Sequence, residues 1–420
     1  MTKNNILYYL TYLFVITLFA YLFYLSKKYI INYWTFSQAH LNYSDGFVKR
    51  GLFGTIALFL ENNYKIKFVN TFNTFFIFFY LANIILLFLI IKQYSKFFFI
   101  FIFLALSPTL ILFSFNDLGG YQRFDVISIF LILFHTYLIY LYRSDKINFS
   151  SYKNKFYFVI FPISLLSLFV HEIQFWSIPF HFFMIKNIYD ENNITSKNLY
   201  ICFLLLIIAS VIVFLYPVSQ QSINSMVERL SDRNIWTDAM TVVASSEGNI
   251  NIIGYEIKTN LLNLYNLKIN LFFLFMGVIP INVLIYFFNK RKLINIKNNK
   301  IYLYFYLSVI PYLTFFAIGD TGRWLHIISI VSFSFLGQYP IDKTKQFINK
   351  SNFFLSKILL FIILIIYCFF VRLPHCCNLE EKKITIWGGL HKKFEAVYKI
   401  YFNNLKDEKF NLNKRFKKNK

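Results

Sequence analysis

The feature that most constrains this chain is a recurrence of apolar stretches long enough to cross a lipid bilayer. The hydrocarbon core of a bilayer is about 30 Å thick, and a helix needs about 20 mostly apolar residues to cross it. Such stretches lie at 6–26, 67–91, 97–115, 125–142, 156–171, 199–217, 269–288, 301–318, 324–338 and 353–371. They predict an all-α fold, a polytopic transmembrane helix bundle.

One further stretch, 175–186, is shorter and contains Pro179. It can be a short span, a kinked continuation or a re-entrant segment. The bundle is therefore predicted to have about 10–11 spans. The side of the membrane reached by the C-terminus depends on whether this stretch crosses.

Composition supports the membrane class and argues against nucleic-acid binding. Hydrophobic residues make up 57% of the chain, which is too many for a soluble domain of 420 residues. The formal charge of +23 comes from Lys and Arg that lie mostly between apolar stretches, not along one amphipathic face. The four cysteines form neither a disulfide framework nor a CxxC metal site.

The distribution of Lys and Arg predicts the orientation. These residues are frequent in one set of connections, at 92–96, 143–155, 186–197, 290–300 and 343–350. The short connections of the other set contain only Arg123 and Arg323. By the positive-inside rule the first set and the N-terminus are cytoplasmic. The basic tail, 372–420, fits this orientation poorly, because the parity of the spans places it outside.

Within the predicted bundle, 1–371, the two longest connections face outward. The first, 27–66, contains Leu52 to Leu60, in which Leu52, Ile56, Phe59 and Leu60 have helical spacing. That spacing predicts an amphipathic helix that lies on the membrane interface or is tucked under the bundle. The second, 218–268, is rich in polar residues and is predicted to form a small extracytoplasmic cap.

Four clusters of acidic and basic residues map to the outward face. They contain, in chain order, Asp45, Lys49 and Arg50; Asp117, Arg123 and Asp125; His171 and Glu172; and Asp320 and Arg323. Each has a structural alternative: Asp117 and Asp320 as helix N-caps, Arg123 as a snorkelling side chain, Lys49 and Arg50 as contacts for anionic lipid, and Glu172 as a partner in a structural ion pair.

The coincidence of four such clusters on one face predicts an anion-binding pocket. Arg and Lys side chains bind phosphate or diphosphate, while a carboxylate deprotonates a hydroxyl group. A lipid carrier fits this arrangement, because its tail lies between the spans while its headgroup enters the outer pocket. A cation pathway would instead require acidic residues in both halves of the membrane.

At these residues the chain resembles bacterial membrane enzymes of surface-polysaccharide assembly. It is similar to the Wzy-like polymerases of O-antigen and capsule repeat units, which act on undecaprenyl-diphosphate-linked glycans. It also looks like GT-C membrane glycosyltransferases, which place an acidic catalytic residue in the first outward loop, before an interfacial helix. The order of Asp45 and Leu52 to Leu60 matches that layout, although no paired Asp-Glu follows the first span.

The resemblance implies an extracytoplasmic glycosyltransferase in the bacterial inner membrane. Polymerisation of polyprenyl-linked repeat units is the first hypothesis, transfer of one sugar from a polyprenyl phosphate the second, and a lipid-linked glycan flippase or transporter the third. We expect Asp45 or Glu172 as the base, with His171 beside it and Asp320 orienting Arg323. Lys49, Arg50, Arg123 and Arg323 are expected to bind the diphosphate.

The glycosyltransferase hypothesis requires no cofactor if the arginines neutralise the charge of the leaving group. One divalent ion held by Asp45, Asp117, Asp125 and Asp320 remains an alternative. The expected partners are the polyprenyl-linked glycan, the lipid bilayer and other polysaccharide-assembly proteins.

Overall fold

A computed structural model describes the helices that carry most of the predicted site. The described residues are 3–28, 33–95, 97–110, 113, 122–195, 197–215, 218–231, 271, 274–275, 278, 280–286, 300–316, 321–341, 362–363 and 366–367. Within these ranges all regular structure is helical. The all-α prediction is therefore confirmed for this part of the chain.

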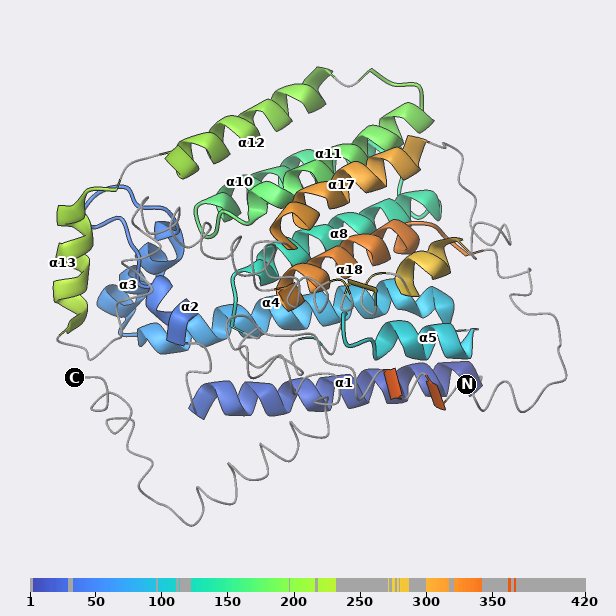
Figure 1. Ribbon diagram of the computed structural model, residues 1–420, viewed down its shortest axis with the longest axis horizontal. Helices are drawn as coiled ribbons and strands as arrows, with labels where there is room; N and C mark the ends of the chain where they lie inside the picture. The colour runs from blue at the N-terminus through green and yellow to red at the C-terminus, as the bar shows by residue number, and fades with distance from the viewer. Residues whose placement is uncertain are drawn as a thin grey trace, which may run out of the picture.

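The long helices lie side by side in one bundle, and α13 crosses their axes at one end (Figure 1). The elements are α1 (Lys3–Lys28), α2 (Tyr33–Gln38), α3 (Gly51–Tyr64), α4 (Phe68–Ile91), η1 (Lys92–Tyr94), α5 (Phe98–Ala105), α8 (Asp125–Arg143), α9 (Phe149–Lys155), η2 (Phe156–Ile160), α10 (Phe161–Leu168), α11 (Gln174–Glu191), α12 (Lys197–Leu215), α13 (Gln220–Ser231), α17 (Lys300–Phe316) and α18 (Thr321–Gly337).

Polar contacts at the helix ends define the directions of the central helices. The C-terminal ends of α8, α11 and α18 meet, because Arg143 Nη2 lies 2.6 Å from Glu191 Oε1 and Arg143 Nη1 donates to Gln338 Oε1 at 3.0 Å. These three helices therefore run in the same direction. Helix α17 runs against them, since Tyr304 near its start donates to Asp190 near the end of α11 at 2.7 Å.

We call the end of the bundle where α8, α11 and α18 begin the site end. Helices α2, α3 and α13 lie at this end, on the left of Figure 1. Next to α3, edge-to-face and tilted aromatic pairs fill the core: the ring centroids of Phe72 and Phe76 are 4.8 Å apart and those of Phe53 and Phe124 are 5.3 Å apart. This packing fixes α3 against α4 and against the start of α8.

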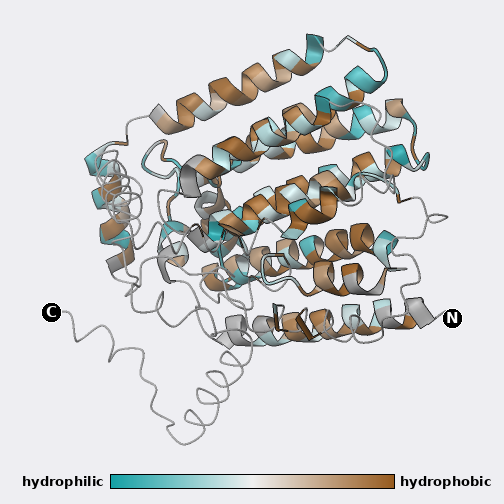
Figure 2. Cartoon of the chain, turned by 45° about the vertical axis from the view of Figure 1, so that its right-hand side comes forward, coloured by the Kyte–Doolittle hydropathy of each residue, from teal (hydrophilic) through white to brown (hydrophobic). Residues whose placement is uncertain are grey.

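Three described helices are long and apolar enough to cross a membrane: Phe68–Tyr94, Asp125–Arg143 and Lys197–Phe214. Helix α1 contains a shorter apolar run, Tyr8–Tyr21. In Figure 2 the middles of the long helices are hydrophobic, whereas hydrophilic residues gather at their ends and along α13. By length and composition, three of the described helices could therefore cross a membrane.

The predicted span 97–115 is not one continuous helix. Helix α5 ends at Ala105, and residues 108–110 form a turn. Pro108 explains the early end, because proline lacks an amide donor and disfavours helical backbone in the residue before it. The predicted stretch 175–186, in contrast, lies within a longer helix, α11, which includes Pro179.

Helix α3 contains the predicted amphipathic segment, and Leu52 packs against the core, but Ile56 and Phe59 of the predicted stripe do not face the bundle. Ile56 is 49% exposed and Phe59 is 56% exposed, while Gly54 and Ala57 are buried. A Cβ atom on Gly54 would lie 2.0 Å from the carbonyl oxygen of Leu41. Glycine therefore allows α3 to approach the preceding segment, and Phe53 packs into the core while Ile56 and Phe59 point outward.

Candidate functional site

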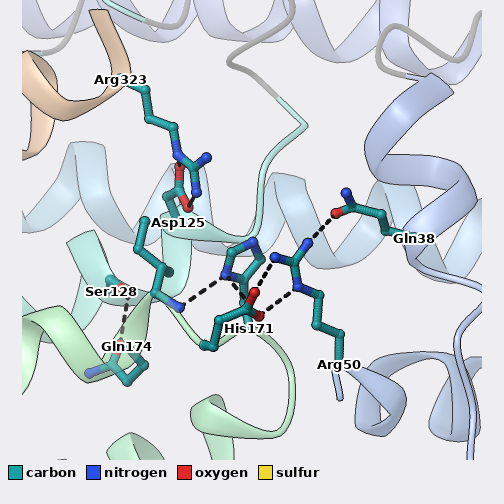
Figure 3. A network of polar contacts seen from close by, with 9 residues as sticks. Gln38, Arg50, Asp125, Ser128, His171, Gln174 and Arg323 are labelled. Carbon is teal, nitrogen blue, oxygen red and sulfur yellow. Dashed lines mark hydrogen bonds and ion pairs between the residues drawn. The ribbon is translucent and has the colours of Figure 1, made fainter. Parts of the chain in front are cut away.

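Two arginine–carboxylate pairs lie close together at the site end, with His171 between them (Figure 3). Their side chains come from segments far apart in the sequence: the start of α3, the start of α8, the turn between α10 and α11, and the start of α18. We call Arg50, Glu172, His171, Asp125 and Arg323 the ion-pair cluster.

The first pair joins Arg50 to Glu172. Arg50 Nε donates to Glu172 Oε2 at 2.6 Å, and Arg50 Nη2 donates to Glu172 Oε1. The third guanidinium nitrogen of Arg50, Nη1, donates to Gln38 Oε1 on α2 at 2.6 Å. The two charged side chains are only 12% and 16% exposed. A bidentate pair with this little solvent contact is strong and geometrically specific.

The backbone of Arg50 contributes to this placement. Arg50 is the N-cap of α3 and has a φ of 63°, in the left-handed region. A non-glycine residue in that region is uncommon and costs about 1 kcal/mol. The surrounding contacts of Arg50 therefore hold it in a conformation that directs its guanidinium toward Glu172.

The second pair joins Arg323 to Asp125. Arg323 Nη2 donates to Asp125 Oδ1 at 2.6 Å, and Arg323 Nε donates to Asp125 Oδ2. Asp125 is the first residue of α8, where the positive end of the helix dipole favours a carboxylate. The guanidinium also lies over the ring of Trp324, 5.1 Å from its centroid.

His171 lies between the two pairs and interacts electrostatically with all four charged groups. Its Nδ1 accepts a hydrogen bond from the backbone N–H of Ile173 at 3.1 Å. In the neutral ring the proton is therefore on Nε2. The distance from Nδ1 to Glu172 Oε2 is 3.8 Å, too long for a hydrogen bond. His171 thus offers a donor, not a base, in this arrangement.

Burial and neighbouring charge act on Glu172 in opposite directions. Burial alone would raise the pKa of Glu172, but the Arg50 and His171 charges and the Arg50 hydrogen bonds outweigh it and hold the pKa well below the ordinary value. Glu172 is consequently ionised while it is paired with Arg50. A carboxylate held in this way accepts a proton poorly until its arginine partner moves away.

Lys49 is a buried cation beside the first pair. It is 8% exposed and makes no hydrogen bond or close ion pair with any described residue. Burial lowers the pKa of Lys49, the charge of Glu172 opposes this effect, and the charge of Arg50 adds to it. A lysine that is mostly enclosed and lies beside a second cation, Arg50, favours binding of an anion.

The described part of the site has more positive than negative charge. Arg123 acts electrostatically on Asp125, so four cations, Lys49, Arg50, Arg123 and Arg323, accompany two carboxylates, Asp125 and Glu172. The predicted residues Asp117 and Asp320 lie outside the described residues. Arg323, which Asp320 was expected to orient, is paired with Asp125.

Asp45 is not part of the ion-pair cluster. Its carboxylate pairs with Arg229 on α13, with Arg229 Nη1 3.2 Å from Asp45 Oδ1, and its carbonyl oxygen accepts a bond from Ser222 Oγ at 2.7 Å. In the described chain no group of three or more His, Cys, Asp or Glu side chains is placed to hold a metal ion. The predicted set of metal ligands also includes Asp117 and Asp320, which lie outside the described residues.

The sequence interpretation missed a second polar feature, which we call the polar ladder. It consists of three pairs between α8 and α11: Ser128 with Gln174 at 2.8 Å, His135 with His181 at 3.1 Å, and Arg143 with Glu191 at 2.6 Å. The ladder extends from next to the ion-pair cluster to the opposite end of the bundle. The seven-residue spacing of Ser128 and His135 in α8, and of Gln174 and His181 in α11, was a signal available in the sequence.

Gln38 and Arg229 were also missed as site residues. Gln38 is buried on the short helix α2, and its only sequence signal is polarity beside aromatic residues. Arg229 lies in the predicted cap, far from Asp45 in sequence.

Comparisons of the chain with protein-family models, with curated proteins and with solved structures gave no match.

Proposed function

We propose that this protein is an integral-membrane glycosyltransferase that acts at the extracytoplasmic face on polyprenyl-(di)phosphate-linked sugars and polymerises oligosaccharide repeat units. The observation that carries the proposal is the ion-pair cluster together with the two further cations beside it, Lys49 and Arg123, because guanidinium and ammonium groups bind the oxygens of a diphosphate. An apolar bundle beside this cluster suits the lipid part of such a substrate.

The membrane arrangement belongs to the same proposal. We place the site end outside and the N-terminus in the cytoplasm of a bacterial cell, with the protein in the inner membrane. Helix α11 counts as a crossing helix, because it extends alongside α8 between two polar ends. That assignment favours eleven spans. A tag or reporter fused to the C-terminus would be accessible from outside under this arrangement, and only from inside with ten spans.

In the proposed reaction the substrate changes the partners of Arg50. Diphosphate oxygens displace the carboxylate of Glu172 from Arg50, and the freed carboxylate, still buried, becomes a better base. It removes the proton of an acceptor hydroxyl, whose oxygen attacks the anomeric carbon of the donor sugar. The bond from that carbon to the diphosphate breaks, and the leaving polyprenyl diphosphate is stabilised by Arg50, Arg323 and Lys49.

His171 has a different role in this scheme from the one expected for a base. Its Nε2–H donates to a phosphate oxygen, because Nδ1 is occupied by the backbone N–H of Ile173. Asp45 serves outside the reacting centre, since its carboxylate is held by Arg229. No metal ion is required, and the transfer is expected to proceed in the presence of a chelator.

The test uses two carboxylates of similar burial at opposite ends of the bundle. Glu172→Gln in the producing strain is expected to leave single repeat units on the lipid, whereas Glu191→Gln removes the charge from the Arg143 pair and keeps the polymer. Arg323→Ala is expected to behave like Glu172→Gln. Long chains of normal length from both Glu172→Gln and Arg323→Ala, with the proteins present in the membrane, would refute the polymerase.

The polar ladder favours a second candidate function, transport of a lipid-linked glycan. Its polar pairs reach the end of the bundle opposite the ion-pair cluster, as access from both faces requires. A transporter deletion accumulates complete repeat units on the cytoplasmic leaflet. A polymerase deletion accumulates them on the outer leaflet, so the location of the intermediate distinguishes the two functions.

A further inference from the structure

Helix α13 packs on the segment that carries the cations of the site. Its buried side chains Ile223, Met226 and Leu230 lie on one face, spaced three and four residues apart, and form a small cluster with Leu41 and Val48. The other face of α13 is polar and exposed. The helix therefore covers segment 41–50 with a limited apolar contact.

Two polar contacts add to this apolar cluster, and both involve Asp45. Ser222 Oγ donates to the carbonyl oxygen of Asp45, and Arg229 binds the carboxylate through both terminal nitrogens. The Arg229 side chain is 50% exposed and that of Asp45 is 24% exposed. An ion pair in contact with this much water contributes little to stability and is screened by salt. Its use is in fixing the position of the segment.

The same segment is held from its other side by α3. The backbone N–H of Tyr43 donates to Thr55 Oγ1 at 2.9 Å, and the carbonyl oxygen of Leu41 lies against Gly54. Gly46, with a φ of 112°, supplies the turn between these contacts and Lys49. Segment 41–50 is thus fixed between α3 and α13, and any shift at Asp45 is passed along four or five residues to Lys49 and Arg50.

We infer that α13 is a clamp for segment 41–50, and that Arg229, acting through Asp45, is a positioning residue for the anion site. The inference rests on the proposed function, because it assigns Lys49 and Arg50 to the diphosphate. The residue that reaches the substrate is Arg50 or Lys49, and Arg229 sets where they lie. Asp45 is consequently part of the clamp and not the base of the reaction.

The kinetic test uses purified full-length protein in liposomes with a polyprenyl-diphosphate-linked donor. Arg229→Ala and Asp45→Asn are each expected to raise KM for the donor about fivefold, with kcat changed less than twofold. Arg229→Lys is expected to recover part of the loss, and the exchanged pair Asp45→Arg with Arg229→Asp most of it. High salt is expected to raise KM of the native protein toward that of Arg229→Ala. A hundredfold fall in kcat for Asp45→Asn, not recovered by the exchanged pair, would instead identify Asp45 as the base and overturn the inference.

A second measurement does not depend on transferase activity. Val48 belongs to segment 41–50 and is buried against α13. It is replaced by Cys in a variant whose four native cysteines are Ser. Arg229→Ala is expected to speed modification of this Cys by a membrane-impermeant maleimide about tenfold, and the exchanged pair to restore the slow rate. An unchanged rate would refute the clamp. Faster modification without a change in KM would refute the positioning role. Absence of transfer by the native protein, with the modification result as expected, would refute the proposed function and leave the clamp in place.

Discussion

The most informative single experiment on the fold is a double-mutant cycle on Arg50 and Glu172. Glu172→Ala leaves Arg50 with one of its three described hydrogen bonds, the one to Gln38. A hydrogen bond to a charged group contributes about 1.5–3 kcal/mol net, so two lost bonds correspond to about 3–6 kcal/mol. Because the side chains are 12% and 16% exposed, water recovers part of this, and we expect about 3 kcal/mol.

The double variant decides whether the pair is coupled. Arg50→Ala alone leaves Glu172 buried without its cation and is also expected to cost about 3 kcal/mol. The two changes together leave no unpaired charge in the pair, so the double variant is expected to cost about 3 kcal/mol and not 6. The resulting coupling energy is about 3 kcal/mol.

Unfolding free energies are measured in mixed micelles of a denaturing and a mild detergent. Glu172→Gln is the volume-matched control, which keeps one acceptor for Arg50 and is expected to cost about half as much as Glu172→Ala. Additive single effects, with a coupling energy below about 0.5 kcal/mol, would refute the bidentate contact and with it the geometry of the site.

Three further predictions concern other parts of the structure. Gly54→Ala is expected to lower the folded yield severely, because its Cβ would lie 2.0 Å from a backbone oxygen. Gly337→Ala is expected to be milder, because its Cβ would lie 2.6 Å from a side-chain methyl group. Equal yields of the two variants would contradict the packing of α3. Burial lowers the pKa of Lys49, so the unfolded chain holds that proton more tightly and the free energy of unfolding rises with pH up to about 10.5. Lys49→Met should remove this rise in a pH series of unfolding measurements, and a persisting rise would assign it to another group. His135→Leu and His181→Leu are each expected to lower the free energy of unfolding by about 1–3 kcal/mol, because each leaves a buried partner unsatisfied. The double variant is expected to lower it by less than the sum of the two. Additive effects in the same unfolding assay would argue against the contact between the two histidines.

The helices themselves could be predicted from the sequence because apolar length is a strong local signal. Helix α8 was expected at 125–142 and occupies Asp125–Arg143. The error at 97–115 arose because hydropathy alone outweighed Pro108, whose effect is on the backbone and not on polarity. For α11 the short apolar core hid a longer helix, since its last turns are polar and pair with neighbouring helices.

The site was predictable only in part. That Glu172, Arg50, Asp125 and Arg323 belong to one region follows from topology, but which cation binds which carboxylate depends on side-chain packing that no local pattern contains. Asp45 was expected near Glu172 because both were assigned to the outward face. A face of a bundle is wide enough to hold two separate clusters, and α13 supplies a nearer cation for Asp45.

The polar ladder also has a consequence for how the two helices can be assembled. Ser128 with Gln174 and His135 with His181 are each separated by 46 residues in sequence, and Arg143 with Glu191 by 48. Because the three separations are nearly equal, the pairs together define one register of α11 along α8. If α11 slid by one turn along α8, the buried members of these pairs would lose their partners. The apolar interior of the bundle therefore favours the observed register of the two helices.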